Sequence, residues 1–264
     1  MKGRVLIVAG SDSGGGAGIQ ADIKTVTALG GYAMTAITAL TAQNTLGVHA
    51  IHNVPASFVA DQMRVVLDDI GADVIKIGML HSAEVIEAVT ATLESSAPNV
   101  PVVLDPVMIA KGGASLLQDA AQASLKAQLL PRTALLTPNV PEAEVLTGLK
   151  ITCTDDLPIV GQSLMQMGPQ AVLMKGGHLD GWTLSDVLLS ASGTESFSSP
   201  RRQTLHTHGT GCTLASACAV GLAQDLDLVD AVSRARDYVQ TAIRTAPGFG
   251  DGHGPLNHGH TLPK

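Results

Sequence analysis

Short apolar runs rich in β-branched residues recur along this chain, and each is followed by a turn and then by a segment with helical spacing. Such runs are typical of buried parallel strands, and the segments between them are long enough for crossover helices. The expected strands are 5–9, 33–40, 74–77, 102–104, 134–136 and 171–174. The expected helices are 17–29, 56–68, 83–93, 120–130, 142–148 and 157–167. The alternation predicts an α/β fold with helices on both faces of a mostly parallel sheet, a three-layer αβα sandwich.

The last third of the chain follows a different pattern. Stretches 183–189 and 194–197 flank a Ser-Gly turn and predict an antiparallel hairpin at the sheet edge. From Gly211 to about Thr245 the pattern is mostly helical, and the segment 248–260 is rich in glycine and histidine. Nothing resembles a linker or an internal repeat, so we expect one domain over residues 1–264.

Composition narrows the classes of ligand. Aromatic residues make up 2% of the 264 residues, too few for the stacking surfaces of single-strand binders, and the net charge of −7 disfavours nucleic acid. The three cysteines form no disulfide framework, which favours the cytoplasm. No apolar stretch reaches the length of a membrane span, and the run at 5–9 is too short for a signal peptide.

Residues 206–215, His-Thr-His-Gly-Thr-Gly-Cys-Thr-Leu-Ala, are the strongest local signal. Glycines and small polar residues lead into a helical segment, so the turn can present backbone N–H groups to an anion. Cys212 falls in the first turn of that helix, where the macrodipole favours thiolate over thiol. The alternative is an ordinary helix start with a small buried cysteine.

Polar residues also follow most of the other predicted strands. In parallel sheets, ligands bind at the carboxyl ends of strands, so these residues are expected to share one edge. Two acids, a lysine, a glycine-rich loop and the anion turn together supply what phosphoryl transfer requires. The segments are 10–22, 41–45, 78–79, 105–108, 137–142 and 175–178.

The first glycine loop does not match the common nucleotide motifs. After Gly14 and Gly16 the dinucleotide spacing fails because position 19 is Ile, and no Gly-Lys-Ser/Thr occurs anywhere in the chain. A Rossmann dehydrogenase and a P-loop enzyme are both disfavoured.

Several ordered motifs carry a family resemblance over nearly the whole length. The chain resembles the hydroxymethylpyrimidine/phosphomethylpyrimidine kinases of thiamine biosynthesis, within the ribokinase-like superfamily. The resemblance implies a ribokinase-like fold without a separate lid domain, and a homodimer. The motifs are 9–22, 38–45, 76–80, 105–108, 136–143, 174–178, 207–213 and 252–258.

That resemblance also implies an activity and its site residues. The enzyme would use ATP and Mg²⁺ to phosphorylate 4-amino-5-hydroxymethyl-2-methylpyrimidine and then its monophosphate. Gln43 would hydrogen-bond the pyrimidine, in a pocket lined by Gly10, Asp22, Met79 and Val107.

The nucleotide side of the site follows from the same resemblance. Lys175 would contact the ATP phosphates, and Asp105 and Glu142 would organise the metal. The chemistry of the first transfer further suggests Cys212 as its base, with a role in the anion hole alone as the alternative. The remaining nucleotide-binding and anion-hole residues would be Asn139, Thr207, Gly209, Thr210 and Gly211.

The chain departs from related patterns at three places. Broader ribokinase-like enzymes carry Asp at the position of Cys212, and a cysteine there is usual in the pyrimidine kinases. His206 stands where an Asp associated with a monovalent cation often occurs, so potassium is not predicted. Ser13-Gly14 replaces the commoner Pro-Ser in the first loop, which should matter little.

Competing interpretations remain open at this point. A pyridoxal kinase shares the fold and acts on a similar heteroaromatic alcohol, and a non-catalytic pyrimidine-binding regulator would be expected to lack some of the catalytic residues. Asp22 could be a solvated first-turn acid, Met79 a core residue, and Asp105 a turn cap. The tail that contains His253, His258 and His260 is interpreted either as a metal-binding tract or as a terminal strap. Lys111-Gly112-Gly113 is interpreted as part of a mobile flap that closes over substrate.

Overall fold

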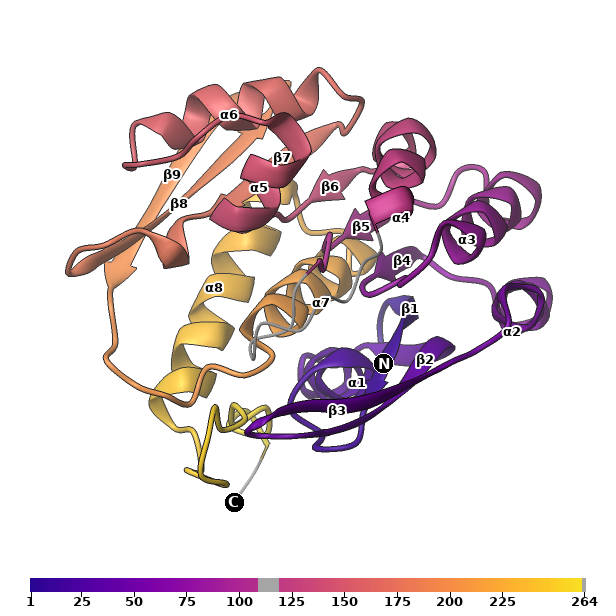
Figure 1. Cartoon of the computed structure of the whole chain (residues 1–264), viewed down its shortest axis with the longest axis horizontal. Coiled ribbons are helices and arrows are strands. Elements are labelled where there is room, and N and C mark those ends of the chain that lie inside the picture. Colours follow the sequence, from indigo (N-terminus) through magenta and orange to yellow (C-terminus); the bar gives the residue numbers. More distant parts are fainter. Residues whose placement is uncertain (109–118, 263–264) are drawn as a thin grey trace.

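The computed structural model describes residues 1–108 and 119–262, so the flap expected at Lys111-Gly112-Gly113 lies outside the described residues. Within that part, nine strands form one sheet in the order β3-β2-β1-β4-β5-β6-β7-β8-β9 (Figure 1). The strands are β1 (Arg4–Asp12), β2 (Tyr32–Asn44), β3 (Gly47–Asn53), β4 (Val74–Ile77), β5 (Val102–Leu104), β6 (Leu135–Leu136), β7 (Ala171–Lys175), β8 (Thr183–Ser190) and β9 (Gly193–Pro200).

The helices fall where the sequence predicts them, with small shifts at their ends. The segment predicted as one helix at 120–130 contains α4, then a π-helical turn (Leu125–Leu129) and a 3₁₀ turn (Leu130–Arg132). A further 3₁₀ turn follows β7 (Gly176–His178). The α-helices are α1 (Gly18–Ala28), α2 (Ala56–Asp69), α3 (Ala83–Ser96), α4 (Asp119–Ser124), α5 (Val140–Thr147), α6 (Asp156–Met165), α7 (Thr210–Ala223) and α8 (Leu228–Arg244).

The sheet is mostly parallel with antiparallel edges. Strands β2, β1, β4, β5, β6 and β7 are parallel, whereas β3, β8 and β9 join antiparallel to their neighbours. The predicted edge hairpin is confirmed as β8 and β9. The sequence analysis missed β3, since this edge strand is largely exposed and lacks a buried apolar run.

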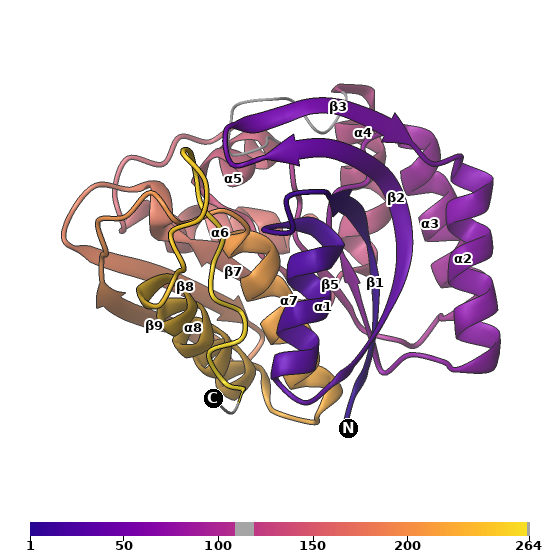
Figure 2. The same cartoon turned by 90° about the horizontal axis from the view of Figure 1, so that it is seen from below.

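Helices cover both faces of the sheet, which confirms the three-layer sandwich. Alternate residues of β1 point into different cores: Leu6 and Val8 belong to the cluster that also holds residues of α2, α3, α5 and α6, while Val5 and Ile7 belong to the cluster that holds residues of α1, α7 and α8. Figure 2 shows β1 and β2 running between α1 on one side and α2 and α3 on the other.

Helix α7 is the central helix of its layer and packs against β1, β4 and β5. Its buried residues are small, among them Ala215, Ala217 and Cys218, so the helix can lie close to the sheet. Gly209 begins it with φ +80°, and a Cβ there would lie 1.8 Å from the carbonyl oxygen of Gly16. Only glycine fits that contact, which brings the start of α7 against the first glycine loop.

The strand order reverses at β1, because β2 lies on one side of it and β4 on the other. Such a reversal leaves a crevice at the carboxyl ends of the strands. In the described residues, no helix combines the length and apolar character that crossing a membrane requires.

Candidate active site

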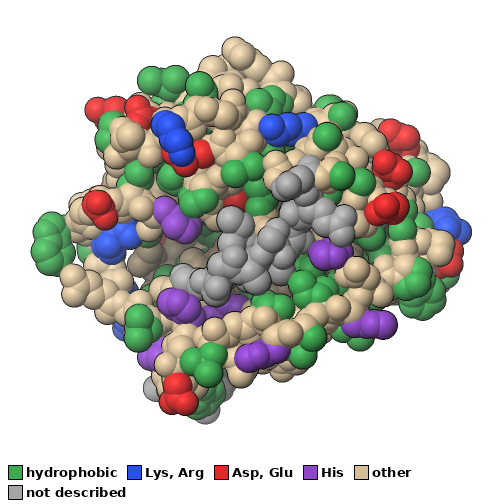
Figure 3. Space-filling view, in the orientation of Figure 1, with side chains coloured by type: hydrophobic (Ala, Val, Ile, Leu, Met, Phe, Trp, Pro, Cys, Tyr) green, Lys and Arg blue, Asp and Glu red, His purple; other side chains and the backbone are tan. Residues whose placement is uncertain are grey.

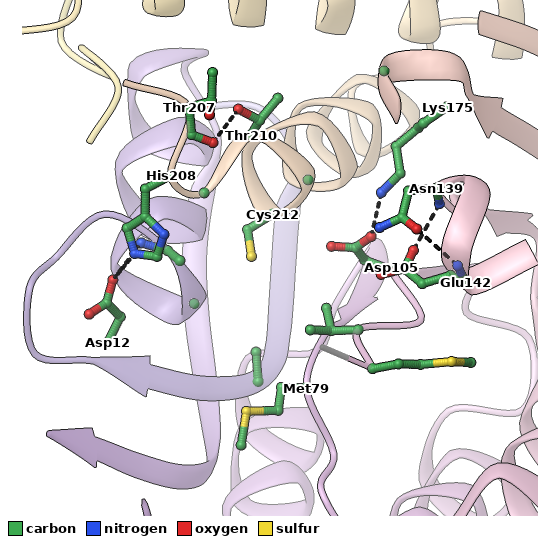
Figure 4. Close-up of a pocket in the computed structure, with 18 of the residues that line it drawn as sticks. Asp12, Met79, Asp105, Asn139, Glu142, Lys175, Thr207, His208, Thr210 and Cys212 are labelled. Atoms are coloured by element: carbon green, nitrogen blue, oxygen red, sulfur yellow. Dashed lines mark hydrogen bonds and ion pairs between the residues drawn. The ribbon is translucent and has the colours of Figure 1, made fainter. Parts of the chain in front are cut away.

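A cavity of about 680 Å³ lies at the carboxyl ends of the central strands, a size typical of small-molecule sites. Figure 4 shows Cys212 near its middle, with the Asp12–His208 pair on one side and Lys175, Asp105 and Glu142 on the other. With one exception, the site residues expected from the sequence line this cavity. They are Gly10, Gln43, Met79, Asp105, Val107, Asn139, Glu142, Lys175, Thr207, Gly209, Thr210, Gly211 and Cys212.

Two side-chain hydrogen bonds order the turn before α7. Thr210 Oγ1 donates to the Thr207 carbonyl at 2.7 Å, and Thr213 Oγ1 donates to the Gly209 carbonyl at 2.8 Å. These bonds use side chains and carbonyls at the start of the helix and fix the direction of its first N–H groups. The helix N-terminus therefore faces the cavity as a centre of positive potential.

Lys175 ends β7 beside this turn. Its Nζ lies 2.9 Å from Asp105 Oδ1, at the end of β5. Burial acts to lower the pKa of Lys175, but the carboxylates of Asp105 and Glu142 raise it above the ordinary value. A Cβ at Gly211 would lie 3.4 Å from both the lysine Nζ and Asp105 Oδ2, so a cation, an acid and a helix N-terminus meet at one point.

Glu142 reaches the same region from α5. It forms a capping box with Asn139: Glu142 Oε2 accepts from the Asn139 N–H at 2.8 Å, and the Asn139 side chain accepts from the Glu142 N–H at 2.9 Å. Burial raises the pKa of Glu142 to about 7, with Asp105 adding to the rise and Lys175 opposing it.

Cys212 corrects the expectation of a stabilised thiolate. Burial raises the pKa of its thiol to about 12, and the negative charges of Asp22 and Asp105 act in the same direction. The nearby charge of Lys76 and the Gly18 N–H oppose this rise but do not overcome it. Loss of hydration outweighs the helix terminus here, so the resting group is a thiol.

Asp22 is the exception among the expected lining residues. It is fully buried beneath the cavity, so it neither lines the pyrimidine pocket nor is a solvated acid. Its carboxylate pairs with Lys76 Nζ at 2.9 and 3.0 Å and accepts from Ser216 Oγ at 2.7 Å. Lys76 itself reaches the cavity wall.

A second buried pair borders the cavity on the side of the glycine loop. His208 Nε2 lies 2.8 Å from Asp12 Oδ2, and the two side chains are 10% and 3% exposed. The carboxylate also accepts from the N–H groups of Gly14, Gly16 and Ala17. The terminal amide of Gln43 lies 3.2 Å from His208 Nε2.

The residues available for a metal are few. Among the described residues, no group of three or more His, Cys, Asp or Glu side chains could hold an ion. Asp105 and Glu142 supply two carboxylates beside Lys175, and Mg²⁺ commonly binds through one or two carboxylates together with substrate phosphates. The two carboxylates therefore fit Mg²⁺ that arrives with a nucleotide.

The histidine-rich tail forms a strap beside the site. The Gly254 carbonyl accepts from the His208 N–H at 3.1 Å, and the His253 N–H donates to the Thr45 carbonyl at 2.8 Å. His258 Nε2 lies 2.9 Å from Thr213 Oγ1, next to the turn before α7.

On the face shown in Figure 3, lysine and arginine side chains are few and stand apart from one another.

The phosphomethylpyrimidine kinase family model matches residues 12–257, which include every element that lines the cavity except the first residues of its glycine loop. The chain belongs to the phosphomethylpyrimidine kinase family. This confirms the resemblance inferred from the ordered motifs.

Three similar proteins include a pyrimidine kinase and a pyridoxal kinase. This family member is 52% identical over 97% of its length to the thiamine biosynthesis bifunctional protein ThiED of Geobacter sulfurreducens, and it spans about half (52%) of that protein. The hydroxymethylpyrimidine/phosphomethylpyrimidine kinase of Bacillus subtilis is 46% identical over 97% of this chain and 94% of its own length. The pyridoxal kinase from Staphylococcus aureus, solved in complex with AMP-PCP and pyridoxal, is similar with a TM-score of 0.90, 32% identity and coverage of 98% and 94%.

Sequence reasoning missed three functional candidates in this family member. Asp12 and His208 stood inside quoted motifs, but their separation in the chain concealed their pairing. Lys76 lies in an otherwise apolar strand. A lysine in such a strand is rarely buried without an acidic partner, and this was the one sequence signal that could have revealed its pairing.

Proposed function

We propose that this chain is an ATP-dependent kinase that phosphorylates 4-amino-5-hydroxymethyl-2-methylpyrimidine and then its monophosphate, in thiamine biosynthesis. One observation carries the proposal: Lys175, Asp105 and the N-terminus of α7 meet at one point of a cavity that also contains Gln43. The names of the relatives support the choice of substrate.

Each residue has a defined task in this proposal. Lys175 and the N–H groups from Gly209 to Cys212 bind and orient the transferred phosphoryl group, whose charge grows on its outer oxygens. Asn139 and Thr207 contact the nucleotide. The pyrimidine lies among Gln43, Gly10, Met79 and Val107.

Asp105 and Glu142 would hold Mg²⁺ with the phosphates of ATP. When bound, the ion neutralises charge on the phosphate oxygens. The carboxyl of Glu142, whose pKa burial raises to about 7, gives up its proton when it joins this site.

The two phosphorylations differ in their need for a base. The hydroxymethyl oxygen must lose its proton as the new P–O bond forms, and Cys212, in the minor fraction present as thiolate, is the group near the middle of the cavity that would accept it. The monophosphate is already largely ionised at neutral pH, with a second pKa of about 6, and needs no base.

The proposal extends to the state of the protein. We infer that residues 1–264 form one catalytic domain, that the enzyme is a homodimer and that it acts in the cytoplasm. The single sheet supports one domain, the family resemblance supports a homodimer, and three cysteines without a disulfide framework support a cytoplasmic setting.

ATP consumption measured in parallel with the pyrimidine alcohol, its monophosphate and pyridoxal tests the function. We expect turnover with the first two substrates and the diphosphate as the final product, identified by phosphorus NMR. Asp105→Asn is the matched inactive control, because it removes one charge at the metal and lysine site without changing side-chain size. Turnover with none of the three would overturn the proposal in favour of a non-catalytic regulator.

Pyridoxal kinase is the second candidate. The similarity to the Staphylococcus aureus pyridoxal kinase over 98% of this chain favours it, since the same cavity could accept a related heteroaromatic alcohol. A higher kcat/KM for pyridoxal than for the pyrimidine alcohol would select this function instead.

A further inference from the structure

The side chain of Asp12 acts only as a hydrogen-bond acceptor. Its Oδ1 accepts from the Gly14 N–H at 2.8 Å, and its Oδ2 accepts from the Gly16 and Ala17 N–H groups at 3.0 and 2.8 Å. Burial opposes ionisation, but His208 and these backbone donors hold the pKa of Asp12 below its ordinary value. An ionised carboxylate can only accept hydrogen bonds, so any further polar neighbour must donate one to it.

That further neighbour is His208. Because its Nε2 lies 2.8 Å from Asp12 Oδ2, this nitrogen must carry a proton. The same nitrogen lies 3.2 Å from one end of the Gln43 carboxamide. The single proton on Nε2 is donated mainly to Asp12 and leaves no lone pair on that nitrogen to accept from an amide N–H. The carboxamide oxygen of Gln43, as the weaker acceptor of this shared proton, is therefore the end that faces His208.

Thr41 leads to the same orientation from the other end of the carboxamide. Its Oγ1 lies 2.9 Å from the Ser11 carbonyl, which can only accept, and 3.1 Å from the second terminal atom of Gln43. The single hydroxyl proton of Thr41 goes to the Ser11 carbonyl, so Oγ1 is left to accept. The amide nitrogen of Gln43 therefore faces Thr41, and the carboxamide is held from both ends.

We propose that Asp12 and His208 form a positioning pair that fixes the Gln43 carboxamide, and that this fixed amide selects an aminopyrimidine over a pyridoxal ring. The inference rests on the proposed function and deepens it. Gln43 lines the cavity, so it presents an oxygen acceptor and an N–H donor side by side. An exocyclic amine beside a ring nitrogen matches that pattern, as adenine does for Asn and Gln, whereas pyridoxal lacks the amine.

Four variants test the coupling: His208→Leu, His208→Gln, Gln43→Ala and the double variant His208→Leu/Gln43→Ala. Calorimetry with the pyrimidine alcohol and with pyridoxal gives the two dissociation constants. We expect His208→Leu to weaken pyrimidine binding about tenfold, the equivalent of one hydrogen bond, and to leave pyridoxal binding unchanged. His208→Gln keeps an N–H donor and should restore most of the affinity. In the Gln43→Ala background, His208→Leu should have no further effect.

Equal losses for both ligands, or additive losses in the double variant, would overturn the specificity role. The ring of His208 packs against Gly16, where a Cβ would lie 2.4 Å from ring Cδ2, so His208→Leu could fail to fold. Nitrogen-15 NMR of the wild-type imidazole gives an independent reading. A proton on Nε2 is expected, and an unprotonated Nε2 would overturn the inference. Absence of wild-type turnover with the pyrimidine alcohol would refute the proposed function, whereas normal turnover with unaltered selectivity in the variants would refute only this inference.

Discussion

Lys76 and Asp22 form an ion pair in which neither side chain is exposed to solvent, with Nζ 2.9 and 3.0 Å from the two carboxylate oxygens. Lys76 comes from β4 and Asp22 from α1, and Ser216 of α7 donates to the carboxylate at 2.7 Å. Burial alone would lower the pKa of Lys76, but the surrounding negative charges raise it above the ordinary value. The pair therefore stays charged behind the cavity wall.

Removal of one partner of this pair should destabilise the protein strongly. Lys76→Met leaves a buried carboxylate without its counter-charge, and we expect the free energy of unfolding in urea to fall by about 3–5 kcal/mol. The double variant Lys76→Met/Asp22→Leu should recover most of the loss, because the core is then apolar. A single variant as stable as wild type would contradict this account.

The high pKa of Cys212 predicts a pH-dependent first phosphorylation. Below a thiol pKa of about 12, the thiolate fraction rises about tenfold for each pH unit. If Cys212 takes the hydroxymethyl proton as thiolate, the single-turnover rate of the first transfer should rise between about pH 7 and 9, while that of the second should not. Cys212→Ala should slow the first transfer more than the second. Equal losses in rapid-quench assays would leave Cys212 with an anion-hole role alone.

Alkylation rates test the same thiol in the resting enzyme. Iodoacetamide reacts with thiolates, so exposed Cys153 should be modified first, and Cys212 and buried Cys218 slowly, because burial raises the pKa of both of the latter thiols to about 12. Peptide mass spectrometry over time separates the three sites. Modification of Cys212 as fast as that of Cys153 near neutral pH would show that its thiolate is populated.

Glu142 should make stability depend on pH in the direction opposite to most acids. Its pKa is raised from 4.5 to about 7 by burial, so the folded state holds a proton that the unfolded state releases. The resulting stabilisation is complete below about pH 4.5 and is lost as pH rises through about 7. Glu142→Gln should flatten this dependence in urea unfolding between pH 5 and 8, by an amount on the order of 2 kcal/mol.

Glu144 is the matched control for that variant, since hydrogen bonds from the Ile151 N–H and Lys150 lower its pKa. Its titration falls below this pH range, so Glu144→Gln should leave the slope between pH 5 and 8 unchanged. Identical slopes for wild type and Glu142→Gln would refute a raised pKa for Glu142.

His258 should stabilise the anion turn from the strap. Thr213 Oγ1 donates to the Gly209 carbonyl, so it must accept from His258 Nε2 at 2.9 Å. Burial lowers the pKa of His258 to about 4, which keeps the ring neutral at neutral pH. We expect His258→Ala to lower the free energy of unfolding by about 1–3 kcal/mol and to lower kcat.

His253 is partly exposed, and the hydrogen-bond neighbour of its ring among the described residues is the Leu205 carbonyl, at 3.3 Å. It serves as the control for this variant, and His253→Ala should keep both stability and kcat near wild type. His258→Gln retains an N–H donor and should recover part of the loss. An unchanged kcat in His258→Ala would show that the strap supports the fold without positioning the turn.

Local patterns were enough to predict the central strands, since Val102–Leu104 and, apart from Lys76, Val74–Ile77 are apolar whatever their neighbours are. They were not enough for β3, whose exposed residues form a strand only because β2 offers a free edge. The prediction of a thiolate at Cys212 was wrong for a related reason. The helix terminus can be read locally, but the burial that raises the pKa of the thiol comes from elements far along the chain.

The Asp12–His208 contact joins residues 196 positions apart, and the Gln43–His208 contact joins residues 165 positions apart. Contacts of such long sequence separation form only after long loops have closed, and proteins dominated by them fold more slowly. The substrate pocket is therefore expected to be among the last parts of the molecule to assemble. A ligand bound there bridges segments that are far apart in the chain, so its binding stabilises the folded state in which these segments meet.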